Sequence, residues 1–519
     1  MSRKYSLDDN SVAVVIGSGA GGGTLANALA QQGIDVVCLE AGKRLEFKDI
    51  VNDEAEMFNK FTWLDERVGE GDAIHDLPLW TCKTVGGSTM HWTAATPRIQ
   101  AHEFRARSTY GDVSGTTLVD WPLSLADIEP YYDKAEDRMG VTGTNGIKQL
   151  PENNNFKVLK AGAVKLGYKD FDTNRMAINP EPRDGRAACL GLGFCSSGCA
   201  TGAKWCTLYT EIPKAEQTGH FELRPECMAV KLETNADGRV SAVHYLDREG
   251  KLRIQKARFV SIAGNTVETT RLLLNSRNDQ FPNGLANSSD QVGRNYLRHM
   301  MVGSVGVMPG AVNMYKGAQV AGVIRDETRH DPKRGFVGGF QLHIVPWTPR
   351  SLGSMLMSAK WGRELTAALE QYRNFACLLV MGEDMPVSDN RITLHPKRTD
   401  QYGLPVPVVR YVHHANNRAM QKYGLAAARR LYQSLGAQQV YEMVDQFSST
   451  HNMGTARMGD DPNTSVCDKW GRTHDIPNLF VSDGSLFPTA ACENPTITIV
   501  ALMLRQGDHI AELMKQGAV

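Results

Sequence analysis

A glycine-rich turn between two strand-like runs near the N-terminus restricts the possible folds more than any other feature of the sequence. The stretch SVAVVIGSGAGGGTLANALAQQGIDVVCLEAG predicts a buried, β-branched strand at 12–16, then a turn, a helix and a second strand at 35–40. Gly17, Gly19 and Gly22 have the spacing G-x-G-x-x-G within it. This order of elements predicts an α/β fold in which neighbouring strands are parallel.

The three glycines have separate roles in binding a dinucleotide. Gly17 permits the tight turn, Gly19 lets a pyrophosphate approach the backbone, and Gly22 lets the helix pack on the strand, so the helix N-terminus points at the phosphates. Glu40 ends the second strand, where a carboxylate can accept hydrogen bonds from both ribose hydroxyls. We therefore predict a Rossmann-like dinucleotide site, and the acid argues against NADP.

A second strand, turn and helix follow far along the chain, in ARFVSIAGNTVETTRLLLNS, after the strand-like runs GHFELRP, MAVKLET and VSAVHYLD. The middle of the chain combines RITLHP and PVPVVRYV with the helical stretch HANNRAMQKYGLAAARRLYQSLG, which predicts an antiparallel sheet with flanking helices. We expect a discontinuous nucleotide-binding domain, a cap segment that contains a cysteine cluster, and a substrate domain. Their predicted ranges are 1–100, 215–300 and 446–519 for the first, 101–214 for the second and 301–445 for the third.

Size and charge exclude several classes of function. A chain of 519 residues is too long for one compact core. Its formal net charge of zero gives no basic field for nucleic acid or anionic lipid. No apolar run approaches the roughly 18 residues of a membrane span, and MSRKYSLDDN is not a secretory signal. We expect folding in the cytoplasm, without membrane insertion; work in the periplasm would need a partner subunit with an export signal.

Four blocks, in order, resemble the glucose–methanol–choline family of FAD oxidoreductases over nearly the whole chain. They are the turn at Gly17, TVGGSTMHWTAATPR, SIAGNTVETTRLLL, and the C-terminal HNMGTARMG with NLFVSDGSLFPTAACENPTITIVAL. The resemblance implies an FAD-dependent enzyme that oxidises the hydroxyl of a sugar, polyol or other small alcohol.

By this resemblance, His451 and Asn494 occupy the catalytic pair of the family. Oxidation of an alcohol requires removal of the hydroxyl proton while hydride leaves the same carbon for flavin N5. A neutral imidazole suits that proton transfer, and an amide can hold the substrate oxygen. The sequence around Asn494 also predicts a helix N-cap, with Pro495 as the first helical residue.

Further cofactor contacts are implied by the other blocks. Asp483 and Gly484 resemble the second FAD contact of the family. The segment Gly86, Gly87, Ser88 and Thr89 resembles the loop along the isoalloxazine ring. HWTAATPR is similar to the pyranose 2-oxidase segment in which a histidine is attached to flavin, so His91 is a candidate for covalent attachment or a neighbour of the ring.

Cys189, Cys195 and Cys199 have the spacing C-x5-C-x3-C in a glycine-rich stretch. The same spacing occurs in catalytic subunits of bacterial membrane-associated FAD sugar dehydrogenases, where three thiolates hold a [3Fe–4S] cluster. The resemblance implies such a cluster, a small chaperone-like subunit, and a cytochrome or other electron acceptor. Soft thiolates on a turn-prone loop suit iron–sulfur ligation.

Other interpretations of the cysteines stay open. Cys206 could complete a [4Fe–4S] cluster, although [3Fe–4S] fits three ligands better, or it could be a buried thiol. Zinc sites commonly use four ligands in C-x2-C pairs, which this spacing fits poorly, and the thiols could also be unligated. The remaining six cysteines (38, 82, 227, 377, 467 and 492) are interpreted as small core residues.

The leading hypothesis is therefore an FAD-dependent dehydrogenase that passes electrons through an iron–sulfur cluster to a partner or external acceptor. The alternative is a pyranose-oxidase-like or glycoside oxidase that uses oxygen without a cluster. A flavin-containing lyase and a catalytically idle subunit are two further classes. The sequence does not identify the substrate.

Overall fold

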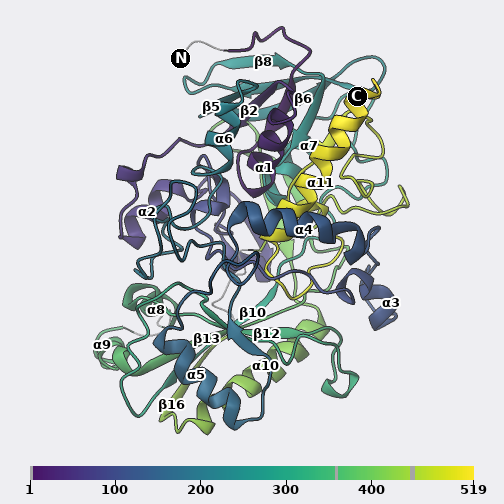
Figure 1. The fold of residues 1–519 in the computed structure, drawn as a ribbon. Helices are drawn as coiled ribbons and strands as arrows, with labels where there is room; N and C mark the ends of the chain where they lie inside the picture. The colour runs from purple at the N-terminus through teal and green to yellow at the C-terminus, as the bar shows by residue number, and fades with distance from the viewer. Residues whose placement is uncertain (1–3, 357–360, 445–450) are drawn as a thin grey trace.

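The computed structural model describes residues 4–356, 361–444 and 451–519. Figure 1 shows two halves, each built around a large sheet, with both chain termini in the upper half. The upper half contains a five-stranded sheet and the lower half a six-stranded sheet. The predicted α/β fold class, a Rossmann-like domain of discontinuous segments plus a domain with an antiparallel sheet, is confirmed.

The five-stranded sheet is parallel throughout and collects strands from distant parts of the chain. All four residues of β1 are buried, as expected for an apolar, β-branched strand covered on both faces. The strand order is β17 (Leu479–Val481), β9 (Phe259–Ile262), β1 (Ala13–Ile16), β2 (Val36–Glu40) and β5 (Phe221–Pro225).

Helices pack around this sheet. The C-terminal helix α11 lies against α1 and α4, and α6 lies beside α1. Helix α7 follows β9 and repeats the strand–turn–helix unit that begins the chain. The helix bounds are α1 (Ala20–Ala30), α4 (Leu125–Met139), α6 (Glu211–Gln217), α7 (Thr266–Asn275) and α11 (Thr496–Lys515).

The six-stranded sheet is antiparallel, and α5 and α10 pack against it. The predicted long helix corresponds to α10, and β4 joins the sheet from within the predicted cap segment. The strand order is β16 (Gln439–Met443), β10 (Met300–Val307), β13 (Phe375–Gly382), β12 (Phe340–Ile344), β11 (Gly322–Ile324) and β4 (Phe171–Thr173). The helices are α5 (Asn154–Lys165) and α10 (Ala415–Ser434).

Two strands predicted for the middle of the chain lie outside this sheet. The runs RITLHP and PVPVVRYV form β14 (Arg391–Thr399) and β15 (Pro405–Tyr411), which pair with each other and with β3 (Val68–Gly71). They bury Ile392, Val409 and Tyr411 in a small separate core. The two strands therefore bury these apolar side chains in this small core and not in the core of the six-stranded sheet.

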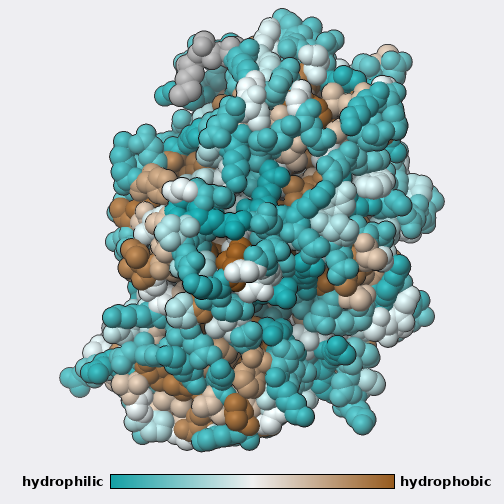
Figure 2. All heavy atoms as spheres, viewed as in Figure 1, coloured by the Kyte–Doolittle hydropathy of each residue, from teal (hydrophilic) through white to brown (hydrophobic). Residues whose placement is uncertain are grey.

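The remaining elements are short. A third small sheet contains β6 (Met228–Thr234), β7 (Val240–Leu246) and β8 (Leu252–Lys256). The other helices are α2 (Glu54–Phe61), α3 (Ala106–Tyr110), α8 (Pro349–Leu356) and α9 (Arg363–Glu370). Hydrophobic side chains form small separate patches on the face drawn in Figure 2. Among the described helices, none has the length and apolar character to cross a bilayer.

Candidate active site

A cavity of about 380 Å³ connects the two large sheets. One end is lined by the turn after β1 and by Glu40 at the end of β2. The other end is lined by Met301 on β10, His343 on β12 and Met381 on β13. A ligand in this cavity would therefore contact the dinucleotide-type turn and the antiparallel sheet at once.

The glycine turn leaves room for a ligand at one position and none at another. An added Cβ at Gly22 would lie 2.0 Å from the carbonyl oxygen of Gly17, so close packing of helix on strand requires glycine there. At Gly19 the nearest heavy atom to an added Cβ would be the Gly87 Cα at 3.6 Å, and both glycines line the cavity. This space at the N-terminus of α1 fits a pyrophosphate.

The Glu40 carboxylate is buried at the edge of the cavity. One oxygen accepts hydrogen bonds from the Ser18 amide at 3.0 Å and the Ser18 hydroxyl at 2.7 Å, and the other accepts from the Gly42 amide at 2.9 Å. Burial raises its pKa, while these hydrogen bonds act in the opposite direction. The carboxylate is thus held rigidly where the sequence predicts a ribose contact.

Asp483 is held by the second strand–turn–helix unit, the one formed by β9 and α7. Its carboxylate accepts hydrogen bonds from the Asn265 amide at 3.0 Å and the Thr269 hydroxyl at 2.6 Å, and it caps the short helix that starts at Gly484. Asp483 and Gly484 both line the cavity. The two predicted cofactor contacts near the C-terminus therefore lie with the glycine turn.

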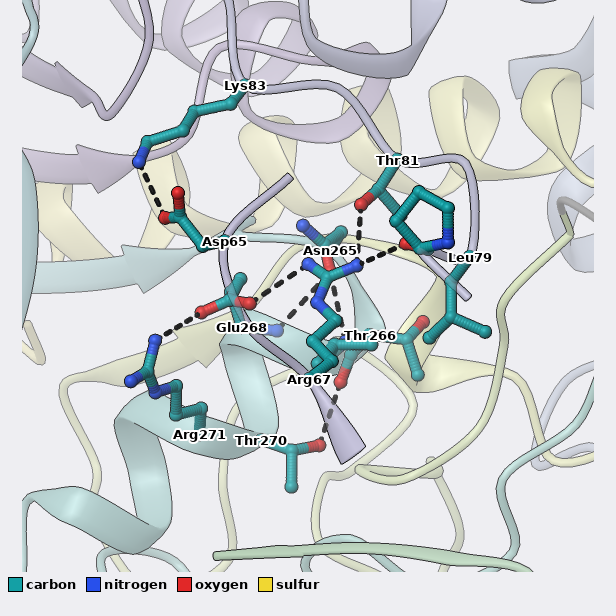
Figure 3. A network of polar contacts seen from close by, with 12 residues as sticks. Asp65, Arg67, Leu79, Thr81, Lys83, Asn265, Thr266, Glu268, Thr270 and Arg271 are labelled. Atoms are coloured by element: carbon teal, nitrogen blue, oxygen red, sulfur yellow. Dashed lines mark hydrogen bonds and ion pairs between the residues drawn. The ribbon is translucent and has the colours of Figure 1, made fainter. Parts of the chain in front are cut away.

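A buried network of charged side chains supports one wall of the cavity (Figure 3). Arg67 bonds Glu268 at 3.0 Å and the Thr81 hydroxyl at 2.9 Å. On the other side, Glu268 lies 3.5 Å from Arg271, which in turn bonds Asp400 at 2.7 Å. The network fixes the start of α7 against the segment before the 84–91 loop, because each of these charges depends on its partner once buried.

The loop predicted to lie along a flavin ring meets the glycine turn directly. The Gly86 amide donates a 3.0 Å hydrogen bond to the Ser18 hydroxyl. Gly86 has φ +98°, a left-handed conformation that favours glycine. The residues Gly87, Ser88 and Thr89 line the cavity.

His91 is buried at the end of this loop and also lines the cavity. Its ring stacks on Trp80, with centroids 4.8 Å apart and planes 6° apart. Its Nε2 has no hydrogen-bond partner among the described residues, and burial lowers its pKa to about 3. A neutral imidazole with one unpaired nitrogen therefore lies at the cavity wall.

The predicted catalytic pair meets in the cavity. Asn494 Nδ2 lies 3.5 Å from His451 Nε2 and 3.9 Å from the Met381 sulfur. The Asn494 Oδ1 atom is buried and has no partner among the described residues. Asn494 therefore offers a hydrogen-bond acceptor beside the imidazole.

The predicted capping role of Asn494 is wrong. Helix α11 begins at Thr496 with Pro495 in the N-cap position, and no side chain caps it. The Asn494 side chain faces His451 instead, because the helix starts one residue later than predicted. Pro495, Thr496 and Ile499 at the uncapped start of α11 line the cavity together with the predicted catalytic pair.

Two histidines that sequence reasoning missed lie next to this pair. His299 Nδ1 is 2.6 Å from His451 Nδ1, and the two rings are nearly perpendicular, at 89°. His343 lines the cavity, and its Nε2 has no partner among the described residues. The sequence signals were weak, because His299 only precedes a strand and His343 only alternates within one.

The histidines in this region are neutral. Burial lowers the pKa of His451 well below its ordinary value, and His299, His343 and His91 lower it further. Burial also lowers the pKa of His299 to about 4 and that of His343 to about 3. His451 is therefore available as a base at neutral pH.

Cys189, Cys195 and Cys199 lie in the segment 189–199, the cysteine loop, which is outside the helices and strands of the structure. All ten cysteines are free thiols, and Cys189, Cys195 and Cys199 are the three that are partly exposed. The six scattered cysteines are buried, as predicted. Cys206 is also buried, and its sulfur lies 3.1 Å from the Thr89 hydroxyl and 3.3 Å from the Met90 sulfur, which fits the interpretation as a buried thiol.

The surroundings of the three cysteines favour a thiolate at Cys199 but not at Cys189 or Cys195. Cys189 accepts a hydrogen bond from the Gly191 amide at 3.4 Å, and Cys199 accepts one from the Lys204 amide at 3.5 Å. Although burial opposes it, hydrogen bonds from Thr201 and Lys204 lower the pKa of Cys199. Burial raises the pKa values of Cys189 and Cys195, and the neighbouring thiols add to this rise.

Lys204 is a buried cation between this loop and the cavity loop. Its ammonium group donates to the carbonyl oxygens of Met90 and Trp92, both at 2.8 Å, and of Cys195 at 2.5 Å. Burial lowers its pKa, and the charges of Cys195 and Cys199 act against that effect. The nearby thiols are thus the groups that would balance its charge as thiolates.

The three sulfurs do not form a mononuclear metal site. Among the described residues, the one set of three His, Cys, Asp or Glu ligand atoms within 4.8 Å of one another is Glu103, Cys492 and Glu493. A zinc ion at about 2.3 Å from each thiolate would hold three sulfurs closer than that limit. A cluster of several irons spaces its thiolates farther apart, so the donor set and its hydrogen bonds fit a cluster better than zinc.

Comparison with protein families finds two matches, both described as GMC oxidoreductase. The N-terminal family model matches residues 75–301, and the C-terminal model matches residues 386–502. Together they contain the loop at 84–91, the predicted catalytic pair and the cysteine loop.

Individual proteins with similar sequences or structures are oxidoreductases. The 2-methyl-1,2-propanediol dehydrogenase of Mycolicibacterium austroafricanum is 32% identical, over 97% of this chain and 95% of its own. The fructose dehydrogenase large subunit of Gluconobacter japonicus is 29% identical, over 97% and 98%. The formate oxidase of Aspergillus oryzae has a similar fold, with a TM-score of 0.72 and 16% identity over 99% and 100% of the two chains.

Proposed function

The chain belongs to the GMC oxidoreductase family, and from this premise we propose that it is an FAD-dependent dehydrogenase of a sugar, polyol or related alcohol hydroxyl. The proposal rests above all on the contact of His451 with Asn494 in a cavity that also reaches the glycine turn. Membership of the family makes it an oxidoreductase of CH–OH groups.

FAD fits the residues at the upper end of the cavity. The turn at Gly17, Gly19 and Gly22 would hold the pyrophosphate, and Glu40 would bind the adenosine ribose. Asp483, Gly484 and the loop at Gly86 would bind the flavin-bearing part. Bound FAD would supply the acceptor for the hydride that leaves the substrate carbon.

The side chains of the chain itself would bind the alcohol and take its proton. His451 Nε2 would accept the hydroxyl proton, because burial keeps this imidazole neutral. Asn494 would hold the same substrate oxygen through its amide. The unpaired Nε2 of His343 would hydrogen-bond a second substrate hydroxyl, which suits a diol or sugar.

The proposal is tested by anaerobic reduction of the bound flavin with a panel of sugars, polyols and simple alcohols. Wild-type protein should lose its flavin absorbance near 450 nm with at least one donor. His451→Ala should bind FAD but reduce it about 10² to 10⁴ times more slowly. A wild-type flavin that no alcohol bleaches would favour the lyase or idle-subunit hypothesis.

His91 is proposed as a neighbour of the flavin ring and as the candidate for a covalent link to it. Its orphan Nε2 is the observation that supports this placement. Acid precipitation separates the two cases, because covalent flavin stays with the protein and noncovalent FAD is released.

We also propose that Cys189, Cys195 and Cys199 ligate a [3Fe–4S] cluster. Their partial exposure, the hydrogen bonds to two of their sulfurs and the buried Lys204 support this. Such a cluster would pass electrons singly to an acceptor outside the chain, as a cytochrome subunit or a quinone-like dye can. A small chaperone-like subunit and transport to the periplasm with it belong to the same proposal.

Iron and acid-labile sulfide analysis with EPR tests the cluster on anaerobically purified protein. The oxidised [3Fe–4S] form should give a paramagnetic signal that disappears in a Cys195→Ser variant. Substantial release of hydrogen peroxide without iron would instead support the oxidase alternative, for which the pyranose-oxidase-like HWT segment is the observation in favour.

A further inference from the structure

His299 lies behind the catalytic base and contacts a group that can only accept a hydrogen bond. Its Nε2 lies 3.2 Å from the backbone carbonyl oxygen of Ala490. A carbonyl oxygen has no proton to donate, so His299 Nε2 must carry the hydrogen. In a neutral ring the second nitrogen, Nδ1, is then an acceptor.

That acceptor faces His451 at hydrogen-bond distance. The Nδ1 atoms of the two rings are 2.6 Å apart, so one of them must donate and the other accept. Because the His299 Nδ1 atom has only a lone pair, His451 Nδ1 must carry the hydrogen. A neutral His451 then has its lone pair on Nε2, the nitrogen that faces Asn494 Nδ2 at 3.5 Å.

We propose that His299 is a positioning residue that selects the reactive tautomer of His451 through the chain Ala490 carbonyl, His299, His451. The inference rests on the proposed function, in which His451 Nε2 takes the substrate proton. The hydrogen-bond partner of one imidazole nitrogen determines which nitrogen is protonated, and here the partner is an imidazole of fixed tautomer rather than a carboxylate.

The surroundings of His299 and His451 favour the neutral form of both imidazole rings. His299 is 1% exposed, and burial lowers its pKa to about 4, so it is not a cation at neutral pH. The titratable groups whose charges affect the two rings are His343 and His91, and burial keeps both of them neutral as well. A neutral partner can fix the tautomer without raising the basicity of His451 as strongly as a buried carboxylate would.

Replacing His299 with leucine or asparagine separates this role from simple packing. Leucine fills space but has no acceptor, so His451 loses its tautomer preference. Asparagine keeps an acceptor oxygen at the position of Nδ1. We expect His299→Leu to lower the rate constant of flavin reduction 10²-fold or more, with FAD content and substrate affinity changed less than threefold. His299→Asn should stay within about tenfold of wild type.

Nitrogen NMR of protein labelled with [¹⁵N]histidine gives a readout that does not need turnover. The oxidised wild-type protein should show His451 with a protonated Nδ1 and a bare Nε2, assigned by the loss of its signals in His451→Ala. In His299→Leu the two nitrogens should give averaged shifts of mixed tautomers, and His299→Asn should restore the wild-type pattern.

Two results would overturn the inference. One is an Nε2-protonated His451 in the wild-type protein. The other is a flavin reduction rate that is the same in His299→Leu as in wild type, or as low in His299→Asn as in His299→Leu. Failure of the proposed function is distinguishable, because the wild-type flavin would then resist every alcohol while the NMR tautomer could still be read.

Discussion

The two ring nitrogens of His451 have different neighbours: Nδ1 contacts His299, and Nε2 contacts Asn494. The His299 side accepts a hydrogen from Nδ1, and the Asn494 side leaves Nε2 open to the cavity. Burial and three neighbouring histidines keep the ring uncharged. At the scale of single residues, the site thus contains a neutral imidazole rather than an ion pair.

The low pKa of His451 predicts the pH dependence of flavin reduction. In the proposed mechanism His451 acts as a neutral base, which is present above its pKa and lost as the pH falls through it. Since that pKa lies well below the ordinary 6.5, the rate constant at saturating substrate should be flat from pH 9 down past pH 6.5. Anaerobic stopped-flow measurements check this, and a tenfold fall per pH unit beginning at pH 6.5 would contradict it.

A second prediction at this scale concerns the buried carboxyl of Glu383. Burial raises its pKa to about 8, and its Oε1 accepts hydrogen bonds from the Tyr110 hydroxyl at 2.7 Å and the Gly339 amide at 3.0 Å. A raised pKa stabilises the fold at low pH and loses that contribution as the pH rises towards 8. Glutamine keeps the acceptor but does not titrate.

Glu383→Gln should therefore become more stable relative to wild type as the pH increases. Between pH 5 and pH 8 the difference should grow by up to about 1.4 kcal/mol per pH unit. Thermal unfolding followed at several pH values measures it. A difference that is independent of pH would show that Glu383 ionises as it does in the unfolded chain.

At the scale of elements, the first strand–turn–helix unit contains two glycines with different roles, one in packing and one at the cavity. Gly22 lies where the helix packs on the strand, and Gly19 lies where the cavity begins. The sequence pattern predicts both glycines. The structure adds the distances that separate a folding role from a binding role.

Alanine substitution should separate the two roles. Gly19 has φ −71°, which alanine adopts, and its added methyl would meet only ordinary contacts. Gly19→Ala should therefore fold with an unfolding temperature close to that of wild-type apoprotein but contain little FAD. Gly22→Ala should disturb folding itself. Circular dichroism, thermal unfolding and flavin content measure these effects, and full FAD content in Gly19→Ala would contradict the assigned pyrophosphate position.

The buried network at the start of α7 gives a second prediction for an element. Glu268 faces Arg67 and Arg271, and all three side chains are almost fully buried. Glu268→Gln would leave these buried cations without part of their compensation, at a cost of about 3–5 kcal/mol. Exposed Glu249, which pairs with Lys251 at 3.2 Å, is the control, since Glu249→Gln should change stability by about 0.5 kcal/mol or less. Equal unfolding temperatures for the two variants would rule the network out as a support of α7.

At the scale of the whole molecule, Lys204 connects the cysteine loop to the loop at His91. It holds carbonyl groups of both loops with one buried ammonium. If the three thiols ligate a cluster, Lys204→Met should lower the iron content per FAD, because the thiolates lose their buried cation. Lys204→Gln can still donate to the carbonyls, so a similar loss in that variant would assign the effect to charge.

Lys214, which is partly exposed and pairs with Asp184 at 3.3 Å, provides the matched control. Lys214→Met should keep the iron and FAD content of wild type. Full iron content in Lys204→Met would show that its charge does not support the thiolates.

The sequence alone determined the parts of this protein that depend on local order. The turn at Gly17, the strands around it and the helix at 415–434 follow from periodicity and from conformations that few residues adopt. The parallel arrangement follows from their order along the chain. The pair His451 and Asn494 came from a family resemblance, because nothing local distinguishes these two residues from others of their type.

Only the tertiary structure decided which distant side chains surround that pair. His299 immediately precedes β10 and His343 lies within β12 of the same sheet, and their approach to His451 depends on how that sheet faces the parallel one. Asn494, two residues before α11, faces His451, and Lys204 bonds carbonyl groups of two loops far apart in the chain. Such contacts result from the packing of whole elements, which local patterns do not specify, and the burial that this packing produces keeps the histidines neutral.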